Sequence, residues 1–163
     1  MLIRTATIDD IPAVLVMLAK TCALHESWDA AKYGLRSPPA GRSPSHPEQH
    51  YEKWLTRLLH KERSVFLVAE EEEKLVAFLA ATVEPEISIY SLQEFAFIHD
   101  IWVEPEYRKK GIAQQIIKLT VERFQEMGIK QIRLDTVAAN ESARQLFKSY
   151  GFRLTTMEML MEI

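Results

Sequence analysis

The spacing of apolar and polar positions along the chain predicts an alternation of short strands and amphipathic helices. Six runs rich in apolar and β-branched residues have the length and the flanking turn residues of strands. These strands are expected at residues 2–6, 65–69, 75–83, 94–103, 129–136 and 157–163. The second and third form a hairpin around the charged stretch 70–74, whose four consecutive glutamates are more typical of a solvated turn than of a cation site.

Apolar residues at helical spacing predict four helices between these strands. The cap and stop residues are Thr7 for the first helix, Ser45 with Glu48 for the second, Gly128 for the end of the third, and Asn140 and Gly151 for the fourth. The predicted order is β-α-α-β-β-β-α-β-α-β, an α+β arrangement with strand–crossover–strand units in its second half. Residues 25–47 carry six glycines and prolines, so they predict a long loop.

Composition narrows the class of protein. The length of 163 residues suits a single domain spanning 1–163, and 47% hydrophobic with 26% charged residues is ordinary for a globular protein. A net charge of −3 argues against a nucleic-acid binder, and no apolar run approaches the roughly 20 residues that span a bilayer. The start of the chain leads into a strand without a signal peptide, which favours a cytoplasmic protein.

Cysteine and histidine add little chemistry of their own. Cys22 is the single cysteine, which excludes an internal disulfide, and its place on the apolar face of the first helix predicts a buried, inert thiol. Four of the five histidines, His25, His46, His50 and His60, lie in the first 60 residues without the convergent spacing of a metal site. We therefore expect no metal.

The most informative stretch is the basic loop of Arg108, Lys109, Lys110 and Gly111, which joins the strand 94–103 to the third helix. Backbone N–H groups in the first turn of a helix lack intrahelical partners, and the helix dipole adds to their attraction for an anion. Gly111 lets the backbone approach a phosphate closely. The G-x-x-x-x-G-K-S/T spacing of a nucleotide P-loop is missing. A plain strand-to-helix turn with solvated basic residues is the alternative.

The segment from Asp100 to Ala113 resembles the acetyl-coenzyme A signature of the GNAT acetyltransferase family, written R/Q-x-x-G-x-G/A, with Ala113 where glycine is common. The order of predicted elements also resembles that of the family. The resemblance implies a mixed central sheet with helices on both faces, and acetyl-coenzyme A as cosubstrate. It implies that the pyrophosphate is bound by the loop Arg108, Lys109, Lys110, Gly111, Ile112 and Ala113.

The resemblance also places the pantetheine arm on the backbone of the central strand, at Ile101, Trp102 and Val103. A backbone N–H of this strand would polarise the thioester carbonyl. The side chains of the same three residues can be part of the core, and the two interpretations are compatible.

An alkylammonium must lose a proton before its nitrogen can attack a thioester, so a base or a water chain is needed. The candidates on or beside the central strand are Glu94, His99, Asp100 and Glu104, of which His99 and Asp100 lie closest to the expected reaction centre. Neighbours on a strand face opposite ways, so only one of the two should face the substrate unless a bulge intervenes. A polar strand residue bonded to a neighbouring loop is the alternative for either.

A second motif, from Ala143 to Phe152, resembles the family pattern A-x-x-L-Y-x-x-x-G-F, whose tyrosine protonates the leaving thiolate. Phe147 stands at that position and has no hydroxyl. Tyr150 lies one turn further along and is either a substitute acid or a core residue. By the same resemblance Asn140 and Phe147 lie beside coenzyme A, although Asn140 can equally be a plain N-cap.

The resemblance thus implies an N-acetyltransferase acting on a primary amine of a small cationic acceptor. Tyr107-Arg108 after the central strand most resembles the diamine and polyamine acetyltransferases, and Glu84, Glu86, Glu94 and Asp100 would suit a cation. Residues 25–51, with Trp28, Tyr33 and Trp54, are the expected acceptor wall, where aromatic rings either hold an ammonium or anchor the loop.

Other functions remain open from the sequence. The acceptor can be an amino acid, an aminoglycoside or a protein amine. A coenzyme A-binding module without catalysis is a rival, which the phenylalanine at 147 favours. An assembly role, in which the last strand and helix pair with a second copy, is another, and a homodimer is compatible with the enzyme as well.

Overall fold

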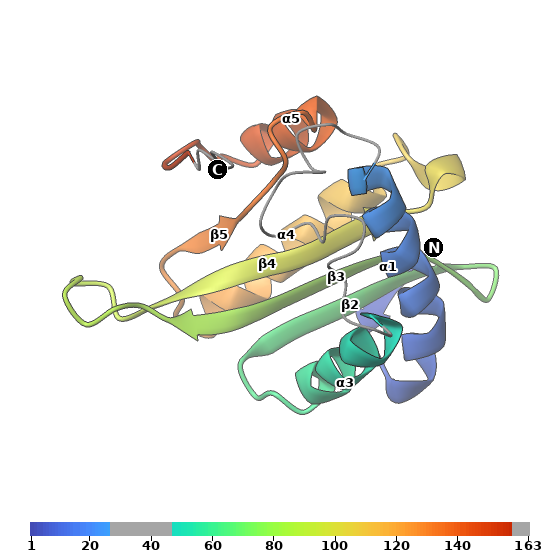
Figure 1. Cartoon of the computed structure of the whole chain (residues 1–163), viewed down its shortest axis with the longest axis horizontal. Helices are drawn as coiled ribbons and strands as arrows, with labels where there is room; N and C mark the ends of the chain where they lie inside the picture. Colours follow the sequence, from blue (N-terminus) through green and yellow to red (C-terminus); the bar gives the residue numbers. More distant parts are fainter. Residues whose placement is uncertain (27–46, 158–163) are drawn as a thin grey trace, which may run out of the picture. The chain divides into compact units, whose positions relative to one another are not determined.

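A computed structural model of the chain describes residues 1–26 and 47–157 (Figure 1). Within these residues the contacts separate two compact units. The first comprises Met1–Ala19 with Glu48–Asp135, and the second contains the other described residues. The single domain over 1–163 stays a prediction.

The first unit is built on a five-stranded sheet in the order β1-β2-β3-β4-β5. Its strands are β1 (Leu2–Thr5), β2 (Ser64–Glu71), β3 (Lys74–Pro85), β4 (Glu94–Val103) and β5 (Ile132–Leu134). Neighbouring strands are antiparallel from β1 to β4, whereas β4 and β5 are parallel. The predicted mixed sheet is confirmed, and β4 has the bounds that the sequence predicts.

The hairpin of β2 and β3 turns through Glu72 and Glu73, which have left-handed φ angles of 51° and 62°. Positive φ at both central residues matches the twist of a two-residue hairpin. Both glutamates are exposed, as expected for a solvated turn.

Helices cover both faces of the sheet, as expected from the long run of buried residues in β2 and β3. In Figure 1, α3 (Pro47–Leu59) lies in front of the strands and α4 (Ile112–Glu126) behind them. Ile112 of α4 packs in one buried cluster with Ala77 and Val103. Leu55 and Leu58 are the most buried residues of α3, on the apolar face that the spacing predicts.

The first long helix is α1 (Ile11–Glu26), which includes the first two residues of the predicted loop 25–47. The last residue of that loop, Pro47, begins α3, and the residues between lie outside the described part of the chain. The buried face of α1 follows Val14, Leu18 and Thr21. Cys22 is half-buried rather than buried, because it lies at the edge of that face.

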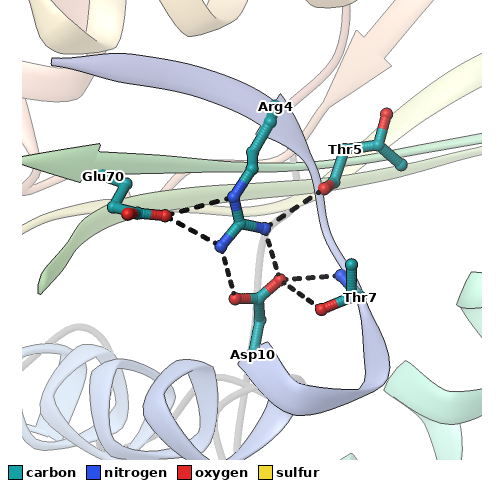
Figure 2. A network of polar contacts seen from close by, with 5 residues as sticks. All are labelled: Arg4, Thr5, Thr7, Asp10 and Glu70. Carbon is teal, nitrogen blue, oxygen red and sulfur yellow. Dashed lines mark hydrogen bonds and ion pairs between the residues drawn. The ribbon is translucent and has the colours of Figure 1, made fainter. Parts of the chain in front are cut away.

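A polar network ties β1 to β2 and to η1 (Ile8–Asp10), the 3-10 turn before α1 (Figure 2). The Arg4 guanidinium donates to both oxygens of Asp10, at 2.7 and 2.9 Å, and to Glu70 Oε2 at 2.9 and 3.1 Å. Asp10 also accepts the backbone N–H of Thr7 at 2.7 Å. Thr7, the expected helix cap, is therefore held through its backbone N–H by the carboxylate of Asp10, three residues later.

The predicted strand 129–136 is wrong in its length, since β5 covers only Ile132–Leu134. Gly128, with φ 78°, donates to the carbonyl of Gln125, and Ile129 donates to that of Phe124 at 3.0 Å. This is a Schellman motif, and Ile129 and Phe124 are both buried. Ile129 thus closes α4 and does not begin the strand.

In the second unit, Asn140 caps α5 (Glu141–Ser149) by accepting the N–H of Ala143 at 3.1 Å, which confirms the predicted N-cap. The helix also ends in a Schellman motif, in which Phe152 donates to the carbonyl of Phe147. Of the predicted strand 157–163, Met157 is exposed and outside any strand, and the remainder lies outside the described residues.

Candidate active site

The loop between β4 and α4 has the backbone of an anion site. After η2 (Pro105–Tyr107), the chain passes through Lys109, with φ 59°, and Gly111, with φ 84°, before α4 begins. Gly111 is the N-cap and supplies no side chain, and the first intrahelical bond is from the N–H of Gln115 to the carbonyl of Gly111. The N–H groups of Ile112, Ala113 and Gln114 therefore point out of the helix end.

The basic side chains of this loop are held in different ways. Arg108 Nε donates to the carbonyl of Val103 at 2.9 Å, and its guanidinium lies 4.6 Å from the centroid of the Trp102 ring. Lys110 Nζ lies 4.8 Å from the centroid of Tyr107. Lys109 is exposed. All three add positive charge beside the helix end, and Arg108 is fixed to the end of β4.

β4 leaves part of its backbone unpaired toward β5. In the described part of the chain, β5 pairs only with Ala96, Phe97 and Ile98, so the later residues of β4 have no strand on that side. Val103 lies opposite Ala77, and the N–H of Glu104 donates to the carbonyl of Val76 at 2.8 Å. This alternation directs the N–H and C=O of Ile101 and Val103 toward the open edge.

The same alternation directs the backbone groups of Trp102 toward β3. The expectation that Trp102 offers its backbone to a ligand therefore does not hold. Its indole is buried, and Nε1 has no hydrogen-bond partner among the described residues.

A β-bulge in β4 brings His99 and Asp100 to one face of the sheet. Ala80 of β3 lies opposite Asp100, but the next residue, Ala81, lies opposite Ile98, so His99 is the extra residue. Asp100 shares the face of Ala80 and therefore of Thr82, two positions on, and His99 bonds to Thr82 itself. This bulge is the exception that the expectation allowed, and with it both side chains lie on the same face.

His99 is held on three sides. Its Nε2 lies 2.6 Å from Thr82 Oγ1, and its ring meets Trp54 of α3 edge-on at 5.3 Å and Phe97 at 5.1 Å. Although the residue is exposed overall, partial loss of solvent around the ring lowers the pKa of His99 below its usual value; nearby Glu84 opposes this shift and Lys61 adds to it. This shift favours the neutral imidazole, which can accept a proton.

Asp100 is the unpaired carboxylate of the site. Burial raises its pKa to about 6, and it makes no hydrogen bond or ion pair within the described residues. The other acidic residues expected to attract a cation are already neutralised: Glu84 by Lys61 at 3.0 Å, Glu86 by Arg133 at 2.6 Å and Glu94 by Arg63 at 2.8 Å. Asp100 is therefore the carboxylate of these four that is left for a cationic ligand.

The other two candidate bases are less suited. The hydrogen bond and charge of Arg63 lower the pKa of Glu94, which makes this carboxylate a weaker base. Glu104 is buried and follows the last residue of β4. Among the described residues, no three possible ligands cluster as a metal site, and no helix is long and apolar enough to cross a membrane.

Comparison with known protein families shows the family of this chain. The model of the acetyltransferase (GNAT) family matches residues 24–152, which include the loop, the bulged strand and α5. The chain belongs to the GNAT acetyltransferase family.

Among its relatives within this GNAT family, one name gives an acceptor and another gives none. N-acetyltransferase 8 of Homo sapiens is 32% identical over 99 residues, 60% of this chain and 42% of that protein. Thialysine N-epsilon-acetyltransferase of Bos taurus is 40% identical over 55 residues, 34% of this chain and 32% of that protein. The chain spans about half the length, or less, of the first curated relatives it matches.

A solved structure shares the GNAT fold over almost the whole chain. It is a predicted acetyltransferase from Clostridium acetobutylicum with acetyl-CoA, with a TM-score of 0.74, 20% identity and coverage of 99% of this chain and 95% of that one. This likeness shows the common fold.

The GNAT residues of the second motif lie in the second unit. Phe147 is buried and packs against Phe152 with ring centroids 5.4 Å apart, the apolar contact of the Schellman motif. Tyr150 is the C-cap of α5 and is half-buried. Roles for Asn140, Phe147 and Tyr150 in binding or catalysis stay predictions.

Two residues of the site were missed in the sequence. Thr82 is the one polar residue in the apolar run 75–83, and this was a signal for a special position. Lys61 follows α3 as one of several exposed basic residues, and no local pattern marks its pairing with Glu84. Of the expected acceptor wall, Trp54 contacts His99, whereas Trp28 and Tyr33 lie outside the described residues.

Proposed function

We propose that this chain is an enzyme that moves the acetyl group of acetyl-coenzyme A to a primary amine of a small cationic acceptor. The observation that carries the proposal is the bulge in β4, which places neutral His99 and unpaired Asp100 on one face of the same strand. Family membership supports it, as do a fold neighbour crystallised with acetyl-CoA and a relative named for acetylating the ε-nitrogen of thialysine.

In this proposal the cosubstrate follows β4 from the loop inward. The pyrophosphate accepts hydrogen bonds from the N–H groups of Ile112, Ala113 and Gln114, which Gly111 allows it to approach, with Arg108, Lys109 and Lys110 adding charge. The pantetheine arm pairs with the open-edge backbone of Ile101 and Val103. Arg108 already donates to the Val103 carbonyl, so this acceptor is in use. The N–H groups of Ile101 and Val103 are the donors that point toward the open edge, and one of them polarises the thioester carbonyl.

Asp100 binds the ammonium form of the acceptor, and His99 takes one proton from it to give the neutral amine. The amine nitrogen then bonds to the thioester carbonyl carbon, and this nitrogen loses its second proton to water as collapse of the tetrahedral intermediate breaks the C–S bond and leaves the neutral amide. The leaving thiolate takes a proton from water or from Tyr150, which remains the proposed acid. Free lysine, polyamines and aminoglycosides are all cationic amines of the kind proposed here. A protein amine is the alternative acceptor.

The test is acetyl-coenzyme A-dependent thiol release across polyamines, amino acids, aminoglycosides and short peptides. Release with one class of small cationic amine, reduced by His99→Asn but not by the exposed His60→Asn, is the expected outcome. No release with any class, in a protein that acetyl-coenzyme A clearly stabilises against heating, would contradict the proposal.

That contrary result is what the second candidate function predicts. A coenzyme A-binding module without catalysis is favoured by Phe147, which replaces the family's tyrosine and is buried against Phe152. A homodimer is compatible with either function, and the strand 157–163 expected to form it lies largely outside the described residues.

A further inference from the structure

A chain of polar groups runs from His99 across β3 to Lys61. Thr82 is 3% exposed and lies between His99 and Glu84. Its Oγ1 is 2.6 Å from His99 Nε2 and donates a hydrogen bond to Glu84 Oε1. The same oxygen of Glu84 accepts Lys61 Nζ at 3.0 Å.

Counting protons along this chain fixes the tautomer of His99. The ion pair with Lys61 keeps Glu84 ionised, so its carboxylate only accepts hydrogen bonds. The single hydroxyl proton of Thr82 is therefore committed to Glu84, and Oγ1 has only lone pairs to offer His99. Nε2 of His99 must carry the ring proton, and the lone pair of the neutral ring is then on Nδ1.

We propose that Thr82 and Glu84 are positioning residues of the acetyl transfer: they hold His99 in the Nε2–H tautomer, which leaves Nδ1 as the basic atom, and Glu84 supports the charge that develops on the ring. The positioning role rests on the proposed function only in that the reaction is taken to be acetyl transfer. When Nδ1 takes a proton from the ammonium, the ring becomes cationic, keeps its Nε2–H bond to Thr82, and later releases the Nδ1 proton to solvent.

The charged groups around the His99 ring determine whether a substitution raises or lowers its pKa. Glu84 on β3 and Lys61 after α3 are the charged groups that act on His99, whereas Trp54 and Phe97 contribute apolar rings; Asp100 is its chain neighbour on the same face. Loss of the Glu84 charge disfavours the imidazolium, and loss of the Lys61 charge favours it. The two substitutions must therefore move the titration of His99 in opposite directions.

The first test needs no substrate. In ¹⁵N NMR spectra of the free protein above the pKa of His99, Nε2 should resonate as a protonated nitrogen and Nδ1 as an unprotonated one. Thr82→Val should produce a mixture of tautomers, and Thr82→Ser should restore the original one. The matched control is Thr120→Val, which removes an equally buried hydroxyl from α4 and should leave His99 unchanged. Wild-type protein with the proton on Nδ1, or with a mixture, would overturn the inference.

The second test uses the pH profile of kcat/KM for the best acceptor. The acidic limb should move to lower pH in Glu84→Gln and to higher pH in Lys61→Met, and Thr82→Val should lower the rate about tenfold with recovery in Thr82→Ser. Shifts of the same sign in Glu84→Gln and Lys61→Met would overturn the inference. An intact tautomer without any turnover would instead reject the proposed function, so the two failures are distinguishable.

Discussion

Gly111 and Gly128 stand at the two ends of α4 with the same left-handed backbone, φ 84° and φ 78°. Neither position crowds an added Cβ, which would meet only the ends of Gln114 and Gln115 at 3.8 and 3.9 Å beside Gly111 and nothing within 4 Å beside Gly128. The cost of a side chain at either glycine is therefore conformational.

We expect Gly111→Ala and Gly128→Ala each to lower the free energy of unfolding by about 1 kcal/mol, because L-residues disfavour this conformation. Only Gly111→Ala should also weaken acetyl-coenzyme A binding, measured by calorimetry, since only Gly111 belongs to the loop. Equal affinity in the two variants would reject the loop as the pyrophosphate site.

A second prediction concerns the base. Because burial lowers the pKa of His99, kcat/KM should fall only as the pH drops below about 6.5, where the imidazole gains its proton. His99→Asn should lower kcat/KM about 10²-fold to 10³-fold and leave only the acidic limb that Asp100 contributes near pH 6, whereas His60→Asn should preserve the whole profile. An acidic limb that is unchanged in His99→Asn would show that His99 does not titrate in the reaction.

A third prediction separates binding from stability at Asp100. Its pKa is raised in the folded protein, to about 6, so stability from the protonated form is complete below pH 3.8 and is lost as the pH rises through 6. Asp100→Asn should therefore raise the free energy of unfolding at pH 7 by about 1–2 kcal/mol, while raising KM for a cationic acceptor about tenfold or more.

Urea unfolding and steady-state kinetics measure the two effects of Asp100→Asn. Glu52→Gln, at an exposed position of α3, is the control and should change neither quantity. A less stable Asp100→Asn protein with an unchanged KM would show that the carboxylate serves the fold rather than the acceptor.

A fourth prediction concerns the network of Figure 2. The hydrogen bonds of Arg4 are the largest cause that lowers the pKa of Asp10, so this stabilisation is present above pH 3.8 and is lost as the pH falls through the lower, folded value. Arg4→Met should lower the free energy of unfolding at pH 7 by about 1–3 kcal/mol, because it leaves a mostly buried carboxylate without its cation.

Urea unfolding at pH 7 and at pH 3 tests the pair, and a double-mutant cycle with Asp10→Asn isolates the coupling energy. Lys118→Met is the control: it breaks an exposed pair with Glu122 and should cost less than about 0.5 kcal/mol. A cost of Arg4→Met no larger than that of Lys118→Met would contradict the role of the network.

Local patterns predicted the parts of this protein that local interactions determine. The bounds of β4, the presence of a hairpin turn within 70–74 and the Asn140 cap follow from residues close in sequence. The prediction of a strand from 129 was wrong because Ile129 is apolar and β-branched, as strand residues often are. Its N–H instead bonds the carbonyl of Phe124 and closes α4.

The arrangement of the site depends on long-range register. Residues around His99 and Asp100 do not show the bulge, which exists only relative to Ala80 and Ala81 of β3. The pairing of Lys61 with Glu84 joins positions 23 residues apart, and it is the reason why Glu84 is already neutralised. Sequence reasoning therefore found the candidate residues but not which of them act together.

The bulged strand β4 is proposed to hold a site for acetyl transfer to a cationic amine. To test this, acetyl-coenzyme A is supplied with an isotope-labelled acetyl group, and the label is sought in the amine product by mass spectrometry. We expect a labelled N-acetyl product from a small cationic amine, formed far more slowly by His99→Asn. Labelled cosubstrate that binds the protein but reaches none of the amines would contradict this proposal.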